Sequence, residues 1–210
     1  DQQPEQGGGS GSDTLGLDIF GQEIWQRAAD NIVLGSTAIV GGINWWGFYG
    51  GEDQPHLPPL GDETFRLRLY GARPNGLPDE TAILYEENFL NLPRTPTGRT
   101  IAVQGRPLEY SYQVALASPV SLSASELYWL EIAQIGDIDS WFRWETGFGA
   151  VTQHAVINYL LSDWHMSSGS YAFQLVAVPE PGSAMLLLFG SSLALRCARS
   201  PRRSRARQAS

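Results

Sequence analysis

The chain has 210 residues and a formal net charge of −8, and its charge is divided unevenly along the sequence. Residues 1–178 hold 8 arginines against 21 acidic residues, a formal charge of −13, whereas six arginines lie in the last 15 positions and lysine is absent. Because phosphate backbones are bound by clustered cations, this acidic body excludes nucleic acid as its partner. Cys197 is the only cysteine, which excludes an intrachain disulfide and a cysteine-based zinc site.

Residues 1–16 carry almost no apolar side chain, and we expect a flexible leader there. No apolar run follows Asp1, so we expect a secretory signal to be absent or already removed. From residue 17 to residue 178, short apolar runs recur between Gly, Pro, Asn and Asp, which is typical of an all-β domain. Strands are expected over 38–49, 65–70, 82–89, 100–103, 110–116, 127–133, 141–145 and 171–176, and short helices are considered only over 21–29 and 156–161.

The strand pattern is clearest where Phe65, Leu67 and Leu69 alternate with arginines. One face of this strand is expected to enter a core, while the guanidinium groups of Arg66 and Arg68 stay in water. Roughly eight or nine such strands, joined by turns, predict an antiparallel β-sandwich of the jelly-roll type over residues 17–178. An open barrel is the alternative.

The chain ends with three adjoining segments of different chemistry. Pro179-Glu180-Pro181 follows the last expected strand, and the two prolines end that strand and leave an extended peptide. Residues 182–195 are uncharged, and as a helix rising about 1.5 Å per residue they cover part of a bilayer core of about 30 Å. The arginine-rich residues 196–210 fit the positive-inside rule, which leaves the acidic body on the far side of the membrane. We therefore expect a short C-terminal transmembrane helix and an exported body.

This ordered ending resembles the PEP-CTERM sorting signal of Gram-negative bacteria, which joins a Pro-Glu-Pro motif, a membrane helix and a basic tail. The resemblance covers residues 179–210 and implies that an exosortase recognises Pro179, Glu180 and Pro181 and that the tail is removed. It implies an inner-membrane-anchored precursor, a mature protein at the cell surface or outside the cell, and association with exopolysaccharide in biofilm. The alternatives are that residues 182–195 form a buried core helix, or that the arginine-rich tail is a nucleic-acid arm or a solvated end.

The body is also similar to ectodomains that precede this signal. The similarity is carried by Ala29-Asp30-Asn31-Ile32, by residues 42–49 and by Gly76-Leu77-Pro78. These ectodomains imply no particular chemistry.

Aromatic residues supply the candidates for glycan binding. Trp45 and Trp46 are adjacent, so in a strand they face opposite sides and cannot both lie in the core. Either ring can stack on a sugar, or pack in the core and at a sheet edge. Trp141 and Arg143 share one face of the next aromatic run, where they can bind a polysaccharide or form a cation–π pair.

Other site chemistries have little support in the sequence. Asp137 and Asp139 have the i, i+2 spacing of calcium-loop carboxylates, but calcium takes about six to eight oxygen ligands, and a solvated acidic loop is the alternative. The histidines show no zinc-binding spacing, and no nucleophile-elbow, Walker or dinucleotide-binding motif occurs. We therefore predict no cofactor, no metal and no catalytic residue.

Together these features predict an exported, non-enzymatic protein with a structural or adhesive role at the cell surface or in the extracellular matrix. A carbohydrate-binding, lectin-like module is the first alternative. A glycan-active enzyme is the second, because acidic residues from distant strands can converge in a sandwich.

Overall fold

The computed structural model describes residues 3–11, 13–17, 23–50, 63–102, 106–135, 142–148, 153–158, 160–161 and 163–178. Every regular element within these ranges is a β-strand, so the all-β prediction is confirmed. The strands are β1 (Gln3–Gly11), β2 (Asp13–Leu17), β3 (Glu23–Val33), β4 (Ala38–Tyr49), β5 (Phe65–Ala72), β6 (Pro78–Phe89), β7 (Thr95–Thr100), β8 (Leu108–Leu122), β9 (Leu127–Gln134), β10 (Phe142–Phe148), β11 (Gln153–Asn158), β12 (His165–Ser168) and β13 (Phe173–Ala177). In these same ranges, no helix has the length and apolar character needed to span a membrane.

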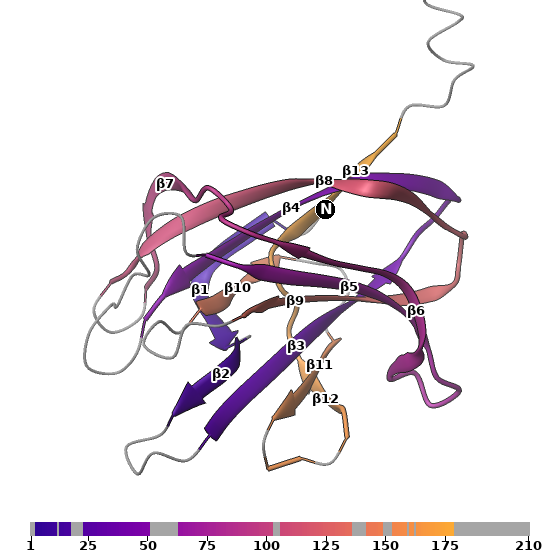
Figure 1. The fold of residues 1–210 in the computed structure, drawn as a ribbon, viewed down its shortest axis with the longest axis horizontal. Helices are drawn as coiled ribbons and strands as arrows, with labels where there is room; N and C mark the ends of the chain where they lie inside the picture. The colour runs from indigo at the N-terminus through magenta and orange to yellow at the C-terminus, as the bar shows by residue number, and fades with distance from the viewer. Residues whose placement is uncertain are drawn as a thin grey trace, which may run out of the picture. The chain divides into compact units, whose positions relative to one another are not determined.

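The strands form two sheets (Figure 1). The six-stranded sheet has the order β1-β10-β4-β8-β7, and β13 also pairs with β4. The seven-stranded sheet has the order β12-β11-β3-β2-β9-β5-β6. The pairings are antiparallel, apart from one parallel pairing of Asp13 in β2 with Gln134 in β9. Long-range antiparallel pairing of short alternating runs is what the sequence pattern predicts.

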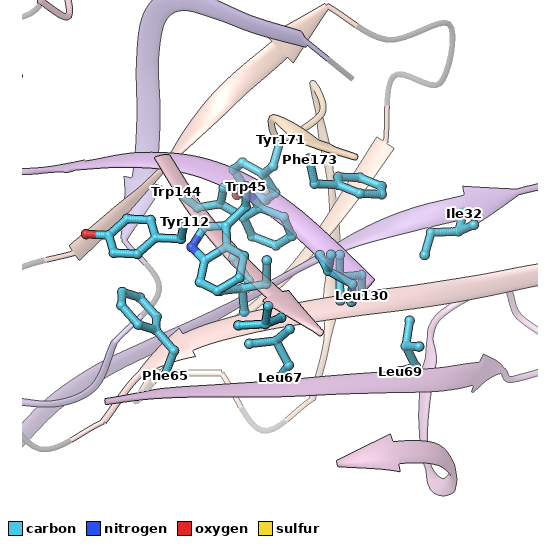
Figure 2. Close-up of a cluster of buried hydrophobic side chains, with 14 of the residues drawn as sticks. Ile32, Trp45, Phe65, Leu67, Leu69, Tyr112, Leu130, Trp144, Tyr171 and Phe173 are labelled. Carbon is cyan, nitrogen blue, oxygen red and sulfur yellow. The ribbon is translucent and has the colours of Figure 1, made fainter. Parts of the chain in front are cut away.

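The inward sides of the two sheets share one apolar cluster (Figure 2). From the six-stranded sheet, the ring of Trp45 stacks on Tyr112 with 5.2 Å between ring centroids. From the seven-stranded sheet, Phe65 meets both rings, and Leu67 and Leu130 extend the cluster along the strands. Because both sheets bury side chains in the same cluster, they pack face to face as a two-layered, sandwich-like fold.

A second, smaller apolar cluster lies on the other side of the seven-stranded sheet. It contains Tyr70, Trp129 and Trp164 together with Ala29 and alanine and isoleucine from β11. Trp129 donates from Nε1 to the Gly76 carbonyl at 3.1 Å, so the turn between β5 and β6 is tied to this cluster. Gly76 has a φ of +83°, a conformation that glycine adopts without steric cost. Gly76 donates its backbone N–H to the Arg73 carbonyl at 2.8 Å, which closes the turn.

Several expectations differ from the structure. The leader predicted over residues 1–16 contains β1, which pairs with β10, and β2, which pairs with β3. A sheet ladder is made by backbone groups, so a glycine-rich segment can join an existing sheet edge without an apolar pattern of its own. The described parts of the helix windows 21–29 and 156–161 contain residues of β3 and β11. In the strand expected over 100–103, Thr100 alone among the described residues lies in a strand, at the end of β7.

The expectation that Arg66 and Arg68 are solvent-exposed on the outer face of β5 is wrong. Their side chains are only 17% and 19% exposed. Both guanidinium groups pair with carboxylates on neighbouring strands, which makes their burial tolerable. The alternation itself is confirmed, because Phe65, Leu67 and Leu69 are fully buried on the opposite side.

Candidate functional site

Trp45 and Trp46 have different environments on β4. Trp45 is fully buried between the sheets, so its ring presents no face to a glycan, and this residue is removed from the candidate site (Figure 2). Trp46 points to the other side of the six-stranded sheet and is half-buried. Its backbone N–H donates to the Ala172 carbonyl at 3.3 Å, which fixes the strand where the ring emerges. The period of two residues therefore assigns one tryptophan to the core and the other to the surface.

Arg143 lies on the same outer side of the six-stranded sheet as Trp46. Its β10 neighbours Phe142 and Trp144 are buried in the core, and alternation turns Arg143 outward. Its Nε donates to the Gly50 carbonyl at 3.0 Å. Among the described residues, the structure gives this guanidinium no further polar partner. Trp141 lies outside the described residues.

The strand register places polar side chains around Trp46. Ser111 of β8 is directly opposite Trp46, and Asn44 pairs with Gln113 of β8 on one side and with Gln174 of β13 on the other. Asn44 donates from Nδ2 to Gln174 Oε1 at 3.1 Å. Phe48 pairs with Arg143, so Arg143 is a diagonal neighbour of Trp46, within reach of long side chains. We name this surface the Trp46 face and define it as Asn44, Trp46, Ser111, Gln113, Arg143 and Gln174.

The remaining predicted site residues are not covered by the structure. Asp137 and Asp139, the calcium candidates, and the motif at 179–181 lie outside the described residues. Within the ranges that are described, no group of three or more His, Cys, Asp or Glu is arranged to hold a metal ion.

A buried ion-pair network on the seven-stranded sheet was not foreseen from the sequence. Glu131 of β9 has no exposed side-chain surface and accepts two hydrogen bonds from Arg27, at 2.9 and 2.6 Å. Arg66 donates to the same carboxylate at 3.1 Å, and the Tyr70 hydroxyl donates to it as well. Burial alone would raise the pKa of Glu131, but the hydrogen bonds and charge of Arg27, aided by Tyr70 and Arg66, hold it below its ordinary value.

Arg27 is held from several sides. It pairs with Glu80 of β6 at 2.7 Å, and its guanidinium lies 5.0 Å from the centre of the Trp164 ring. Burial alone would lower the pKa of Arg27, yet Glu131 and the other anionic neighbours raise it. The network therefore stays charged, and it links β3, β9, β5 and β6 across the sheet.

Two further buried carboxylates are bound by arginine. Glu63, which precedes β5, pairs with Arg94 in the connection between β6 and β7, so the pair joins the two sheets. Burial raises the pKa of Glu63, against the lowering effect of the Arg94 charge. Glu109 of β8 is fully buried and accepts hydrogen bonds from Arg99 of β7. These carboxylates secure neighbouring segments to one another.

Asp30 has a structural role within the Ala29-Asp30-Asn31-Ile32 segment. Its carboxyl group is fully buried and accepts hydrogen bonds from the backbone N–H groups of Asn31, at 2.8 Å, and Tyr171. Burial raises the pKa of Asp30 to about 8, against the lowering effect of these two donors. Asp30 therefore fastens the segment that crosses from β12 in one sheet to β13 in the other. His154, its register partner on β11, packs on the Tyr171 ring at 4.6 Å.

The described side chains thus fall into two groups. Glu131, Glu63 and Glu109 are bound to arginines and Asp30 to backbone N–H groups, whereas the Trp46 face carries an aromatic ring among amides, a hydroxyl and a guanidinium. The first arrangement holds strands together, and the second offers contacts to an external molecule.

Comparison with known proteins gives a family match but no activity. A family model described as a domain of unknown function (DUF7901) matches residues 1–185, which includes both sheets. No curated protein matches the chain.

Proposed function

The chain belongs to the DUF7901 family, and we propose that it is an exported, non-enzymatic protein with a structural or adhesive role at the cell surface or in the extracellular matrix. The observation that carries this proposal is the order of segments at the end of the chain. Pro179-Glu180-Pro181 comes within two residues of the end of β13, and an uncharged segment and an arginine-rich tail follow it.

The export step follows from the charges of these segments. Residues 182–195 anchor the precursor in the inner membrane as a short helix, with the arginines of residues 196–210 on the cytoplasmic side. The acidic body then lies outside, where an exosortase recognises the Pro-Glu-Pro motif and the tail is removed. A net negative body suits an extracellular protein, because like charges limit self-association.

A structural role is supported by the way the body uses its charges. Six arginines form ion pairs within the described part of the chain, and the buried members Glu131, Glu63 and Glu109 each bind one or more of them. A general acid–base pair needs carboxyl groups that face a substrate, whereas these carboxylates face arginines. We infer that the two sheets have a jelly-roll-like arrangement and form a stable scaffold rather than a catalytic cleft.

Mutation of the motif tests the export proposal. The full chain is expressed in its native host or in a Gram-negative host that contains an exosortase. In parallel, a variant carries Pro179→Ala, Glu180→Ala and Pro181→Ala, and Ser183→Ala serves as the matched control beside the motif. We expect the wild type and the control to be shortened and released, and the triple variant to stay with the inner membrane. Equal release of the triple variant, or retention of all three proteins in the cytoplasm, would contradict the proposal.

A further inference from the structure

The Trp46 face has the chemistry of a carbohydrate site, and strand pairing fixes the positions of its residues. Trp46 is anchored on the central strand β4, with β8 on one side and β10 and β13 on the other. Three neighbouring strands span about 10 Å, so the polar groups beside the ring lie at set distances from it. A half-buried tryptophan has little freedom left to lose when a ligand covers its exposed surface.

Arg143 and Gln113 are the two polar side chains of this face that can hydrogen-bond a ligand. Arg143 is oriented by its bond to the Gly50 carbonyl, while its Nη groups have no protein partner among the described residues. This distinguishes it from the six arginines whose charge is paired with a carboxylate. Gln113 is exposed beside Asn44, and the bond between Asn44 and Gln174 holds those amides in place. The exposed amide of Gln113 donates to and accepts from hydroxyls at the same time, whereas Arg143 donates only.

The surrounding charges select among possible partners. A body with 21 acidic residues against 8 arginines repels a polyanion, and one guanidinium on the face does not offset this. A protein partner would need an apolar centre on the face, whereas Ser111, Asn44 and Gln113 border Trp46 and the next ring on this side, Phe48, is buried. An uncharged, hydroxyl-rich polymer avoids the repulsion by the acidic body and needs no large apolar centre. Its sugar ring offers an apolar side to the tryptophan and hydroxyls to the polar side chains beside it.

We propose that the Trp46 face binds a neutral polysaccharide, with the Trp46 ring stacked on a sugar ring and Arg143 and Gln113 hydrogen-bonded to its hydroxyls. The bound sugar replaces water over the ring without changing the sheet. This proposal goes beyond export and does not depend on it, because purified protein binds or fails to bind wherever the cell places it.

Affinity electrophoresis of the purified full chain tests the proposal. Native gels contain hydroxyethylcellulose, dextran or galactomannan as neutral polymers, and alginate as the anionic polymer. We expect at least one neutral polymer to retard the wild type, and Trp46→Ala to weaken the apparent binding at least tenfold. Arg143→Gln is expected to weaken it severalfold, because it removes the two Nη donors while keeping a polar side chain. Trp25→Ala is the matched control, since Trp25 is a half-buried tryptophan on the other sheet and should leave retardation unchanged.

Several results of this experiment would contradict binding of a neutral polysaccharide at the Trp46 face. Lack of retardation in all three neutral gels, retardation by alginate alone, or equal retardation of Trp46→Ala and the wild type would each overturn the proposal. If Trp46→Ala does not fold by near-ultraviolet circular dichroism, Trp46→Phe and Arg143→Gln decide the question, because both keep the sheet surface filled. Wild-type affinity in both of these variants would also overturn it.

Discussion

Removal of the Glu131 charge is the sharpest test of how the scaffold is held together. In Glu131→Gln the side chain keeps its size but loses its charge and one acceptor oxygen, while Arg27 and Arg66 remain at the site with side chains only 14% and 17% exposed. Breaking a buried ion pair by removing one partner costs about 3–5 kcal/mol. Arg27 keeps its bond to the half-exposed Glu80, so we expect the lower end of that range, about 3 kcal/mol.

Urea unfolding followed by tryptophan fluorescence measures this difference. With an m-value of about 2 kcal/mol per molar, the unfolding midpoint should fall by about 1.5 M. Glu86→Gln is the matched control on the same sheet, because Glu86 is 41% exposed and pairs with Arg68 at 2.7 Å. An exposed pair contributes up to about 1 kcal/mol, so the control midpoint should move by less than about 0.5 M. Equal shifts for the two variants would refute the structural role of Glu131.

The pH dependence of the same pair gives a second check on the reasoning. Arg27, Tyr70 and Arg66 hold the pKa of Glu131 below its ordinary value despite its burial. Its contribution to stability is therefore fully present above the pKa of the unfolded chain, about 4.3, and is lost as the pH falls through the folded-state pKa. The difference between the wild type and Glu131→Gln should shrink in acid, and a difference that grows there would contradict this account.

Three further predictions follow from particular residues. Trp45→Ala should cost about 3–5 kcal/mol, because the ring is fully buried, whereas Trp46→Ala should cost less than half as much by the same urea assay. Burial raises the pKa of Asp30 to about 8, so the folded chain keeps a proton that the unfolded chain releases near pH 4. Wild-type stability should therefore fall relative to Asp30→Asn between about pH 5 and 8, and parallel curves would argue against a raised pKa. Gly47→Ala should destabilise by about 1–3 kcal/mol, since its Cβ would lie 2.4 Å from the Phe142 ring, and Gly35→Ala, with nothing within 4 Å of the added carbon, is the control that should not.

The alternation of apolar and polar residues predicted the strands that have one buried face and one more exposed face. The predicted strand over residues 38–49 coincides with β4, and the alternation on β5 and β8 assigns the core side correctly. The adjacency of Trp45 and Trp46 was enough to expect that one ring leaves the core, although not which one. That choice depends on the inward side of β4, which is fixed by pairing with β8, more than 60 residues later in the chain.

The pairing between distant residues could not be predicted from one sequence. Glu131 and Arg27 are 104 residues apart, and no local signal distinguishes them from solvated charges. The glycine-rich β1 has no alternation of apolar and polar residues, so its sequence does not predict a strand. Backbone pairing with β10 places it in the sheet. The same limit applies to the Trp46 face, whose amides and guanidinium come from four different strands. Sequence reasoning named Trp46 and Arg143, and only the register brought Gln113 and Gln174 beside them.

The intact mass of the protein recovered from outside its native host cells tests the central claim most directly. If the chain is exported and sorted through its C-terminal signal, the extracellular protein should end near Pro181 and lack the arginine-rich residues 196–210. An extracellular protein that retains Arg207, or a full-length protein confined to the cytoplasm, would contradict the account.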